Sequence, residues 1–182
     1  MSFGTSKPRK LLDRDALMSY GLRVLSGRAM SIGELKEKLR AKASDESDVE
    51  PVLSSLKQYG YLNDRTFADS FAAARRDNQS FGKMRVLRDL RTKRVPSKVA
   101  EQAVQQAFEG KDEVALIEQY LERKFRGVDL AELLSDEKKL ASAYRRLRTA
   151  GYSSGNSIRV LKRYADRAAE LENIEEGDES RD

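Results

Sequence analysis

One short pattern occurs three times in this sequence, as Leu39-Arg40-Ala41-Lys42-Ala43, Leu90-Arg91-Thr92-Lys93-Arg94 and Leu147-Arg148-Thr149-Ala150-Gly151. An apolar residue stands four positions before each leading leucine, namely Leu35, Val86 and Ala143. Residues four apart lie on the same face of an α-helix, so each copy is typical of the end of an amphipathic helix. A repeat of about 50 residues indicates stacked supersecondary units.

Two further helices are predicted around each copy of the pattern. Nine to eleven residues beyond the leading leucines, another amphipathic segment opens at Val49, Val99 and Ile158. An acidic residue stands ahead of the first helix of each unit, at Asp13, Asp64 and Asp112. We therefore predict an all-α protein with three tandem three-helix repeats, at 13–63, 64–110 and 111–165. We expect a flexible basic segment before them, at 1–12, and an acidic tail after them, at 166–182.

Helix boundaries are indicated by local residue chemistry. Ser31 with Glu34, and Ser47 with Glu50, fit the capping box, in which a serine oxygen accepts an unpaired amide at a helix start. These pairs predict two helix starts. The third repeat contains a longer connection, at 127–136.

The composition argues against most enzyme classes. The chain has neither Cys nor His, which removes disulfides, thiolate metal sites and the commonest general base. Gly82-Lys83 lacks the other residues of a phosphate-binding loop, and the acidic pairs stand where water would solvate them. We expect no enzymatic activity, no metal and no cofactor. No run approaches the roughly 20 apolar residues of a membrane helix, so we expect a soluble cytoplasmic protein.

Charge is distributed unevenly along the chain. The net charge is +5, but residues 1–165 carry 33 basic and 22 acidic side chains, a net charge of +11, while the tail is acidic. A basic body favours binding to polyanions, either nucleic acid or an acidic protein surface. Solubility alone would also account for it.

The strongest local feature is a basic segment at 75–98. Nine positive residues stand there against only Asp77 and Asp89. Our candidate partner-binding residues are Arg75, Arg76, Lys83, Arg85, Arg88, Arg91, Lys93 and Arg94, together with Arg145, Arg146 and Arg148 at the equivalent helix of the third repeat. A helical projection predicts one packing side, made of Met84, Val86, Leu87 and Leu90, and an outward side, made of Arg85, Arg88, Thr92 and Lys93. Tyr20, Phe71 and Tyr120 fall on apolar stripes and are expected in the core.

Several segments resemble the RecX family of regulators. The stretch 20–25, followed by 31–42, is similar to the family's opening motif. Gly60-Tyr61-Leu62-Asn63-Asp64-Arg65-Thr66-Phe67-Ala68 resembles its most recognisable segment, and 82–93 is similar to its central basic helix. The resemblance covers 13–110 well and 111–165 loosely.

The resemblance implies an elongated, curved body of three three-helix units that binds the filament of the RecA recombinase on single-stranded DNA. It also implies inhibition of ATP hydrolysis, of strand exchange and of the co-protease activity that triggers the SOS response. One departure is Arg94, which stands where the family tends to have Gly. Because an arginine disfavours a left-handed helix cap, we expect the helix to end differently or to run one residue longer.

Two other functions are compatible with parts of the sequence. A direct DNA-binding module of helix-turn-helix type fits the short helices and the positive charge, but no helix carries a clear set of base-reading side chains. A generic helical-repeat adaptor fits charge and periodicity, but not the order of motifs at 20–93. Besides the RecA filament, single-stranded or duplex DNA is therefore an alternative partner, and we expect a monomer.

Overall fold

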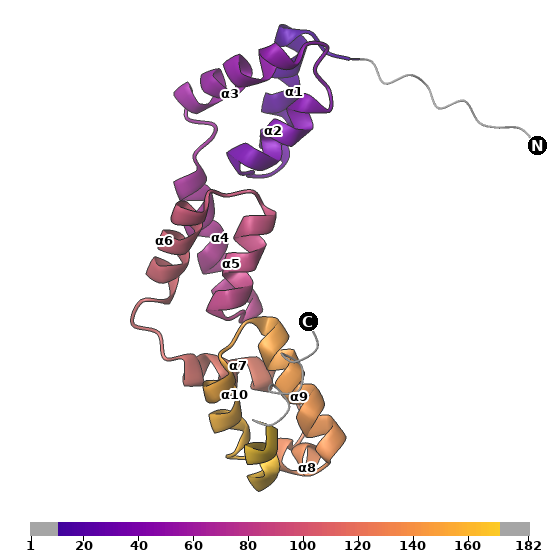
Figure 1. Cartoon of the computed structure of the whole chain (residues 1–182), viewed down its shortest axis with the longest axis vertical. Helices are drawn as coiled ribbons and strands as arrows, with labels where there is room; N and C mark the ends of the chain where they lie inside the picture. The colour runs from indigo at the N-terminus through magenta and orange to yellow at the C-terminus, as the bar shows by residue number, and fades with distance from the viewer. Residues whose placement is uncertain (1–10, 172–182) are drawn as a thin grey trace, which may run out of the picture. The chain divides into compact units, whose positions relative to one another are not determined.

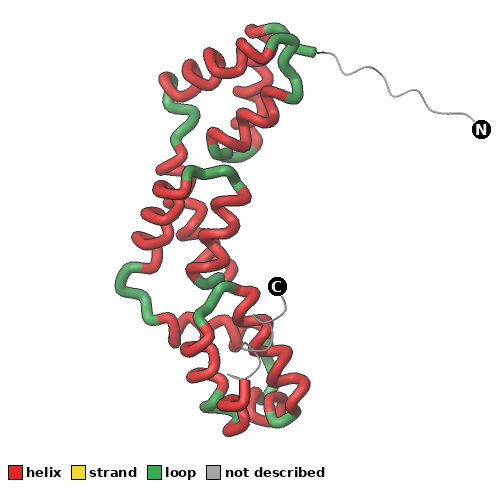
Figure 2. Tube along the Cα trace, in the orientation of Figure 1, coloured by secondary structure: helices red, strands yellow, loops and turns green. Residues whose placement is uncertain are grey.

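Helices joined by loops and turns make up residues 11–171, the part of the chain that the computed structural model describes (Figure 2). Ten α-helices and two short 3-10 helices occur there, and no strand is formed within this part. A single isolated bridge joins Leu12 to Ala43. The all-α prediction is confirmed, while the repeat limits stay predictions. Of the predicted terminal segments 1–12 and 166–182, residues 1–10 and 172–182 lie outside the described residues.

The chain divides into two compact units. The first contains residues up to Ala68 together with Leu90–Ala100, and the second contains Asp69–Asp89 together with the residues from Glu101 onward. The boundary therefore passes through α4 (Asp64–Gln79), α5 (Lys83–Thr92) and α6 (Ser97–Phe108).

The first unit is built around α1 (Arg14–Gly27), α2 (Ile32–Arg40) and α3 (Val49–Gln58), with the 3-10 helix η1 (Glu46–Asp48) leading into α3 (Figure 1). These three helices pack against one another. Leu17, Leu35, Leu39, Leu53 and Leu56 are almost completely buried between them. The i, i+4 pair of the repeated pattern thus lies in the core, as its spacing predicts.

Caps in the first unit agree only in part with the sequence predictions. Ser31 caps α2, accepting the Glu34 amide at 3.0 Å. The predicted capping box of Ser47 and Glu50 is wrong, because Asp45 caps η1 and the Glu50 carboxylate pairs with Lys36.

Asp64 does not stand ahead of its own helix. It is the first residue of α4, where Asn63 accepts the amides at 65 and 66. Instead, Asp64 accepts the amide of Ile32 at 2.8 Å and so caps the start of α2. Burial raises the pKa of this carboxyl, although the Ile32 amide acts to lower it.

The end of α5 corrects the expectation for Arg94. This residue adopts the left-handed conformation, with φ of 57°, and the helix ends at Thr92. Its amide donates to Arg91 O at 2.8 Å and the amide of Val95 donates to Leu90 O at 3.1 Å, which is the bond pattern of a Schellman cap. The arginine therefore occupies the position of a capping glycine at a cost in backbone strain.

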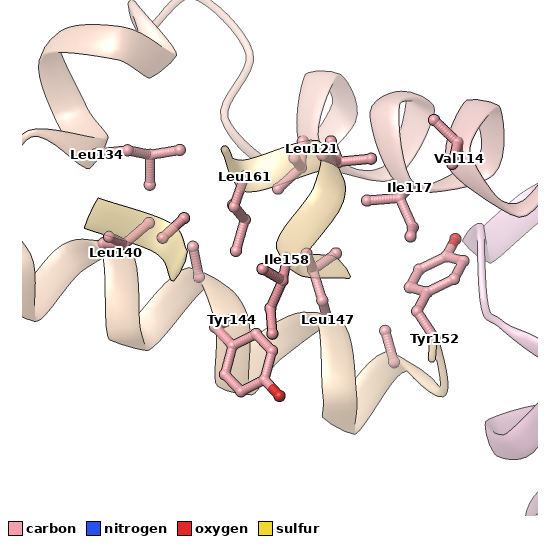
Figure 3. Close-up of a cluster of buried hydrophobic side chains, with 14 residues drawn as sticks. Val114, Ile117, Leu121, Leu134, Leu140, Tyr144, Leu147, Tyr152, Ile158 and Leu161 are labelled. Carbon is pink, nitrogen blue, oxygen red and sulfur yellow. The ribbon is translucent and has the colours of Figure 1, made fainter. Parts of the chain in front are cut away.

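The second unit is centred on α7 (Glu113–Lys124), α9 (Glu137–Ala150) and α10 (Ser154–Leu161). The side chains labelled in Figure 3 come mainly from these helices and pack together in one core that includes Ile117, Leu121, Leu147, Tyr152 and Ile158. The short helix α8 (Leu130–Leu134) lies in the connection at 127–136 and buries Leu134 in this core. The 3-10 helix η2 (Asp166–Leu171) packs against α9 and α10.

Each unit contains the same kind of junction, in which the start of one helix rests on the left-handed end of another. In the first unit, Ser31 donates its hydroxyl to Lys93 O, and Gly33 lies directly against Arg94. In the second, the amide of Gly82 donates to Ala150 O at 2.8 Å and the amide of Met84 donates to Gly151 O at 3.2 Å. The glycines allow this approach, because a Cβ on Gly33 or Gly82 would overlap backbone atoms across the junction. None of the described helices is long and apolar enough to cross a membrane.

Candidate partner-binding surface

A basic hollow of about 270 Å³ lies in the second unit. Its lining contains four cationic side chains, two aromatic rings, two hydroxyl side chains and no carboxylate, as contributed by Phe81, Arg85, Tyr120, Lys124, Ser142, Arg145, Arg146, Thr149 and Ala150. We call this set the basic hollow. A concave surface with this charge attracts an anionic group, and its aromatic walls add apolar contact.

Helical spacing explains why α9 presents these residues. Ser142, Arg145, Arg146 and Thr149 recur at three- and four-residue intervals, so they share one face of the helix. The opposite face, with Leu140, Ala143 and Leu147, is buried in the core. On α7, Tyr120 and Lys124 are four apart and share a face in the same way.

Arg85 is held in place by three contacts. Its Nε lies 3.0 Å from Asp89 Oδ1, one guanidinium nitrogen donates to Thr149 O at 3.4 Å, and the guanidinium lies over the ring of Phe81 at 5.1 Å. Arg75 shares both Asp89 and Phe81, at 3.6 Å and 5.8 Å. The prediction that Arg85 simply points outward is therefore incomplete, because its charge is partly neutralised by Asp89.

Lys124, Arg145 and Arg146 carry the uncompensated charge of the basic hollow. All three are exposed, and none forms an ion pair with another described residue. Burial raises the pKa of the neighbouring Tyr120 phenol although Arg146 acts to lower it, so the ring stays neutral at physiological pH. The hollow thus presents three unpaired cations beside a neutral aromatic edge.

The other predicted residues of the second unit lie outside this lining. Arg76 pairs with Asp77 at 2.6 Å and donates to Ala107 O, so its role is structural. Arg148 donates to Tyr152 O at 2.6 Å across the end of α9. Lys83 and Arg88 are exposed, and Lys83 lines a separate cavity.

Three predicted residues belong to the first unit. Lys93 Nζ lies 3.0 Å from Glu34 Oε1, and Arg94 lies 3.6 Å from Glu37. Arg91 is exposed. Burial acts to raise the pKa of Glu34, but hydrogen bonds from Lys93 and Arg28 outweigh it and lower that pKa overall. Lys93 is therefore a partner of a half-buried carboxylate and is not a free surface charge.

Sequence reasoning missed Lys124 and Phe81. It assigned Tyr120 to the core, whereas Tyr120 is only partly buried against the core and also lines the basic hollow. Lys124 stands at the end of an ordinary amphipathic helix, where a cation is common because of the helix dipole. Phe81 stands just before the central basic helix. Its position four residues before Arg85 was the only feature of the sequence that could have indicated an aromatic ring beside that arginine. Within the described part of the chain, no group of carboxylates is placed to hold a metal ion.

Comparisons with known proteins identify relatives of the chain. The family model described as the second three-helix domain of RecX matches residues 63–104. The regulatory protein RecX of Trichlorobacter lovleyi is 30% identical over 133 residues, covering 73% of this chain and 85% of that protein. RecX of Vibrio parahaemolyticus is 32% identical over 132 residues, covering 72% and 81%.

Solved structures show the same fold. The crystal structure of RecX from Lactobacillus salivarius matches with a TM-score of 0.61 and 18% identity, over 83% of this chain and 96% of that one. A second RecX crystal structure matches with the same score and 20% identity, over 81% and 70%. From the sequence matches, taken with this shared fold, the chain belongs to the RecX family of regulatory proteins.

Proposed function

We propose that this protein regulates the RecA recombinase by binding the filament that RecA forms on single-stranded DNA, and that it acts without catalysis of its own. Binding would inhibit ATP hydrolysis, strand exchange and co-protease activity, and would thereby modulate recombination and the SOS response. We further propose that it acts as a monomer in the cytoplasm.

The observation that carries the proposal is the basic hollow in a chain of the RecX family. Arg85 of the central basic helix and Arg145 and Arg146 of the corresponding helix in the third repeat line this one hollow. A filament of protein and DNA offers acidic side chains and phosphates at regular intervals, and unpaired arginines and lysines bind both. Contact with several such groups at once would raise the affinity well above that of one contact.

The test compares three binding targets for the purified protein: the RecA filament on single-stranded DNA, bare single-stranded DNA and duplex DNA. We expect the filament to bind most tightly and its ATP hydrolysis to fall as the protein is added. Tighter binding to single-stranded or duplex DNA without RecA, with no effect on ATP hydrolysis by RecA, would refute the proposal in favour of a direct DNA-binding protein.

A triple charge reversal tests the basic hollow itself. The variant K124E/R145E/R146E changes three exposed, unpaired cations, so it should fold normally and lose most of the inhibition, because each reversal turns attraction into repulsion. The matched control is R126E/K138E/R159E, which makes the same change in net charge at exposed residues outside the hollow. If the two variants lost inhibition equally, only the overall charge would matter.

A further inference from the structure

A cavity of about 400 Å³ lies in the second unit beside the first turn of α5. Its lining comes from the start of α5, from the end of α6, the start of α7 and their connection, and from the connection between α9 and α10 with the first turn of α10. It shares no lining residue with the basic hollow. The volume falls within the range of about 300–1,000 Å³ that is usual for binding pockets.

The polar groups of the cavity walls already have partners. The Glu113 carboxylate accepts the amide of Ser153 at 3.1 Å and also hydrogen bonds from the Ser153 hydroxyl and the Asn156 amide. The Tyr152 hydroxyl donates to Ser80 O at 2.6 Å. Among the described residues, no buried side-chain nitrogen or oxygen lacks a partner. The walls therefore offer little to a polar ligand, and the side chains of Phe108 and Leu116 favour an apolar one.

The rim of the cavity is different from its walls. Lys83 and Lys111 both line it, both are exposed, and neither forms an ion pair with another described residue. Met84 stands beside Lys83 with 60% of its surface exposed, so the prediction that this large apolar side chain packs inward is wrong. A methionine at such a place adapts its shape to a bound group.

We propose that this cavity binds one apolar side chain from an acidic segment of a partner protein, with neighbouring carboxylates of that segment held by Lys83 and Lys111. An anchor of this kind is the usual energetic centre of a protein interface, because it fills a pocket that excludes water. A nucleobase fits less well, because its polar edges would meet walls whose polar groups are already paired. The inference rests on the proposed function in one respect: it requires that the partner at this face is a protein.

The test uses the full chain labelled with ¹³C at the methionine methyl groups, and it needs no RecA. The signal of Met84 is the one lost in the variant Met84→Leu. The probe is the blocked peptide Ac-Glu-Glu-Leu-Glu-Glu-amide. Two control peptides replace its leucine by alanine or its four glutamates by lysines. We expect a saturable shift of the Met84 signal with the leucine peptide, and at least tenfold weaker binding of both controls.

Protein variants and a nucleic acid complete the test. K83E/K111E should weaken binding of the leucine peptide at least tenfold. K138E/R159E, which makes the same change in charge away from the cavity, should not weaken it. An absent Met84 shift at millimolar peptide would overturn the proposal. So would equal binding of either control peptide, or displacement of the leucine peptide by oligothymidine. Since RecA is absent, such a failure leaves the proposed function standing, whereas a protein that binds the peptide but does not inhibit RecA would refute that function alone.

Discussion

The substitution Gly33→Ala tests the junction between the start of α2 and the end of α5. A Cβ on Gly33 would lie 2.5 Å from Arg94 Cβ and 2.6 Å from Arg94 O, so the two segments would have to separate by about 1 Å to reach normal contact. Overpacking of this kind costs about 1–3 kcal/mol, and loss of the Ser31 hydrogen bond to Lys93 O adds about 1 kcal/mol. The higher helix propensity of alanine offsets about 1 kcal/mol of this loss. The free energy of unfolding should therefore fall by about 1–3 kcal/mol.

Thermal unfolding followed by circular dichroism measures this effect, at about 2–4 °C for each kcal/mol in a chain of this size. The control is Gly27→Ala at the end of α1, where an added Cβ meets nothing within 4 Å and the midpoint should not fall. Adding Arg94→Gly to Gly33→Ala should restore part of the loss, because it removes the contact with Cβ but leaves the contact with the carbonyl oxygen. A Gly33→Ala protein as stable as the Gly27→Ala protein would refute the reasoning.

Three further predictions concern the carboxylates of Asp64 and Glu113 and the exposed cations of the basic hollow. Asp64→Ala should lower the free energy of unfolding by about 0.5–2 kcal/mol, because the Ile32 amide loses its cap, whereas Asp64→Asn keeps an acceptor. Because the folded pKa of Asp64 is raised, its ionised form is disfavoured in the fold. The free energy of unfolding of Asp64→Asn, measured in urea relative to that of the parent, should therefore be higher at pH 7 than at pH 3. For Glu113, burial acts to raise the pKa, but hydrogen bonds from Ser153 and Asn156 lower it overall. The stability that the ionised carboxylate contributes is therefore present above the ordinary pKa of 4.5 and is lost as the pH falls through the folded pKa. Glu113→Ala should therefore flatten the acid side of the stability profile, and an unchanged profile would contradict this. K124E/R145E/R146E should lower the free energy of unfolding by no more than about 0.5 kcal/mol per residue. Loss of a cooperative unfolding transition in circular dichroism would contradict this.

The core could be predicted from the sequence because it depends on spacing within one helix. The i, i+4 pairs Leu35 with Leu39, Val86 with Leu90 and Ala143 with Leu147 are all buried. Periodicity gives the inward face of each helix without any knowledge of what it packs against. The all-α prediction and the family assignment rest on these positions and on motif order.

Caps and charges could be predicted less well, because their partners stand far away in the chain. Asp64 caps a helix that starts 32 residues earlier, and Lys93 pairs with Glu34, 59 residues away. A helical projection gives the direction of a side chain relative to its own helix only. It could not give the Glu34 carboxylate beside Lys93, which is half-buried and follows the last residue of α5. Charge reversal at Lys93 would set two carboxylates together, so the exposed cations of the basic hollow are the better choice for testing binding.

The end of α9 connects the basic hollow with the proposed anchor cavity. Thr149 and Ala150 line the first, and Gly151 lines the second. Gly151 has φ of 93°, and a Cβ there would lie 2.2 Å from Arg85 N, so Gly151→Ala would strain the backbone and displace the start of α5. Both surfaces would then change together. Separate losses in K124E/R145E/R146E and K83E/K111E therefore carry more information. If both surfaces contact one partner independently, the combined variant should lose the sum of the two binding free energies, to within about 0.5 kcal/mol. A combined loss no larger than the greater single loss would show instead that the partner engages one surface only after the other.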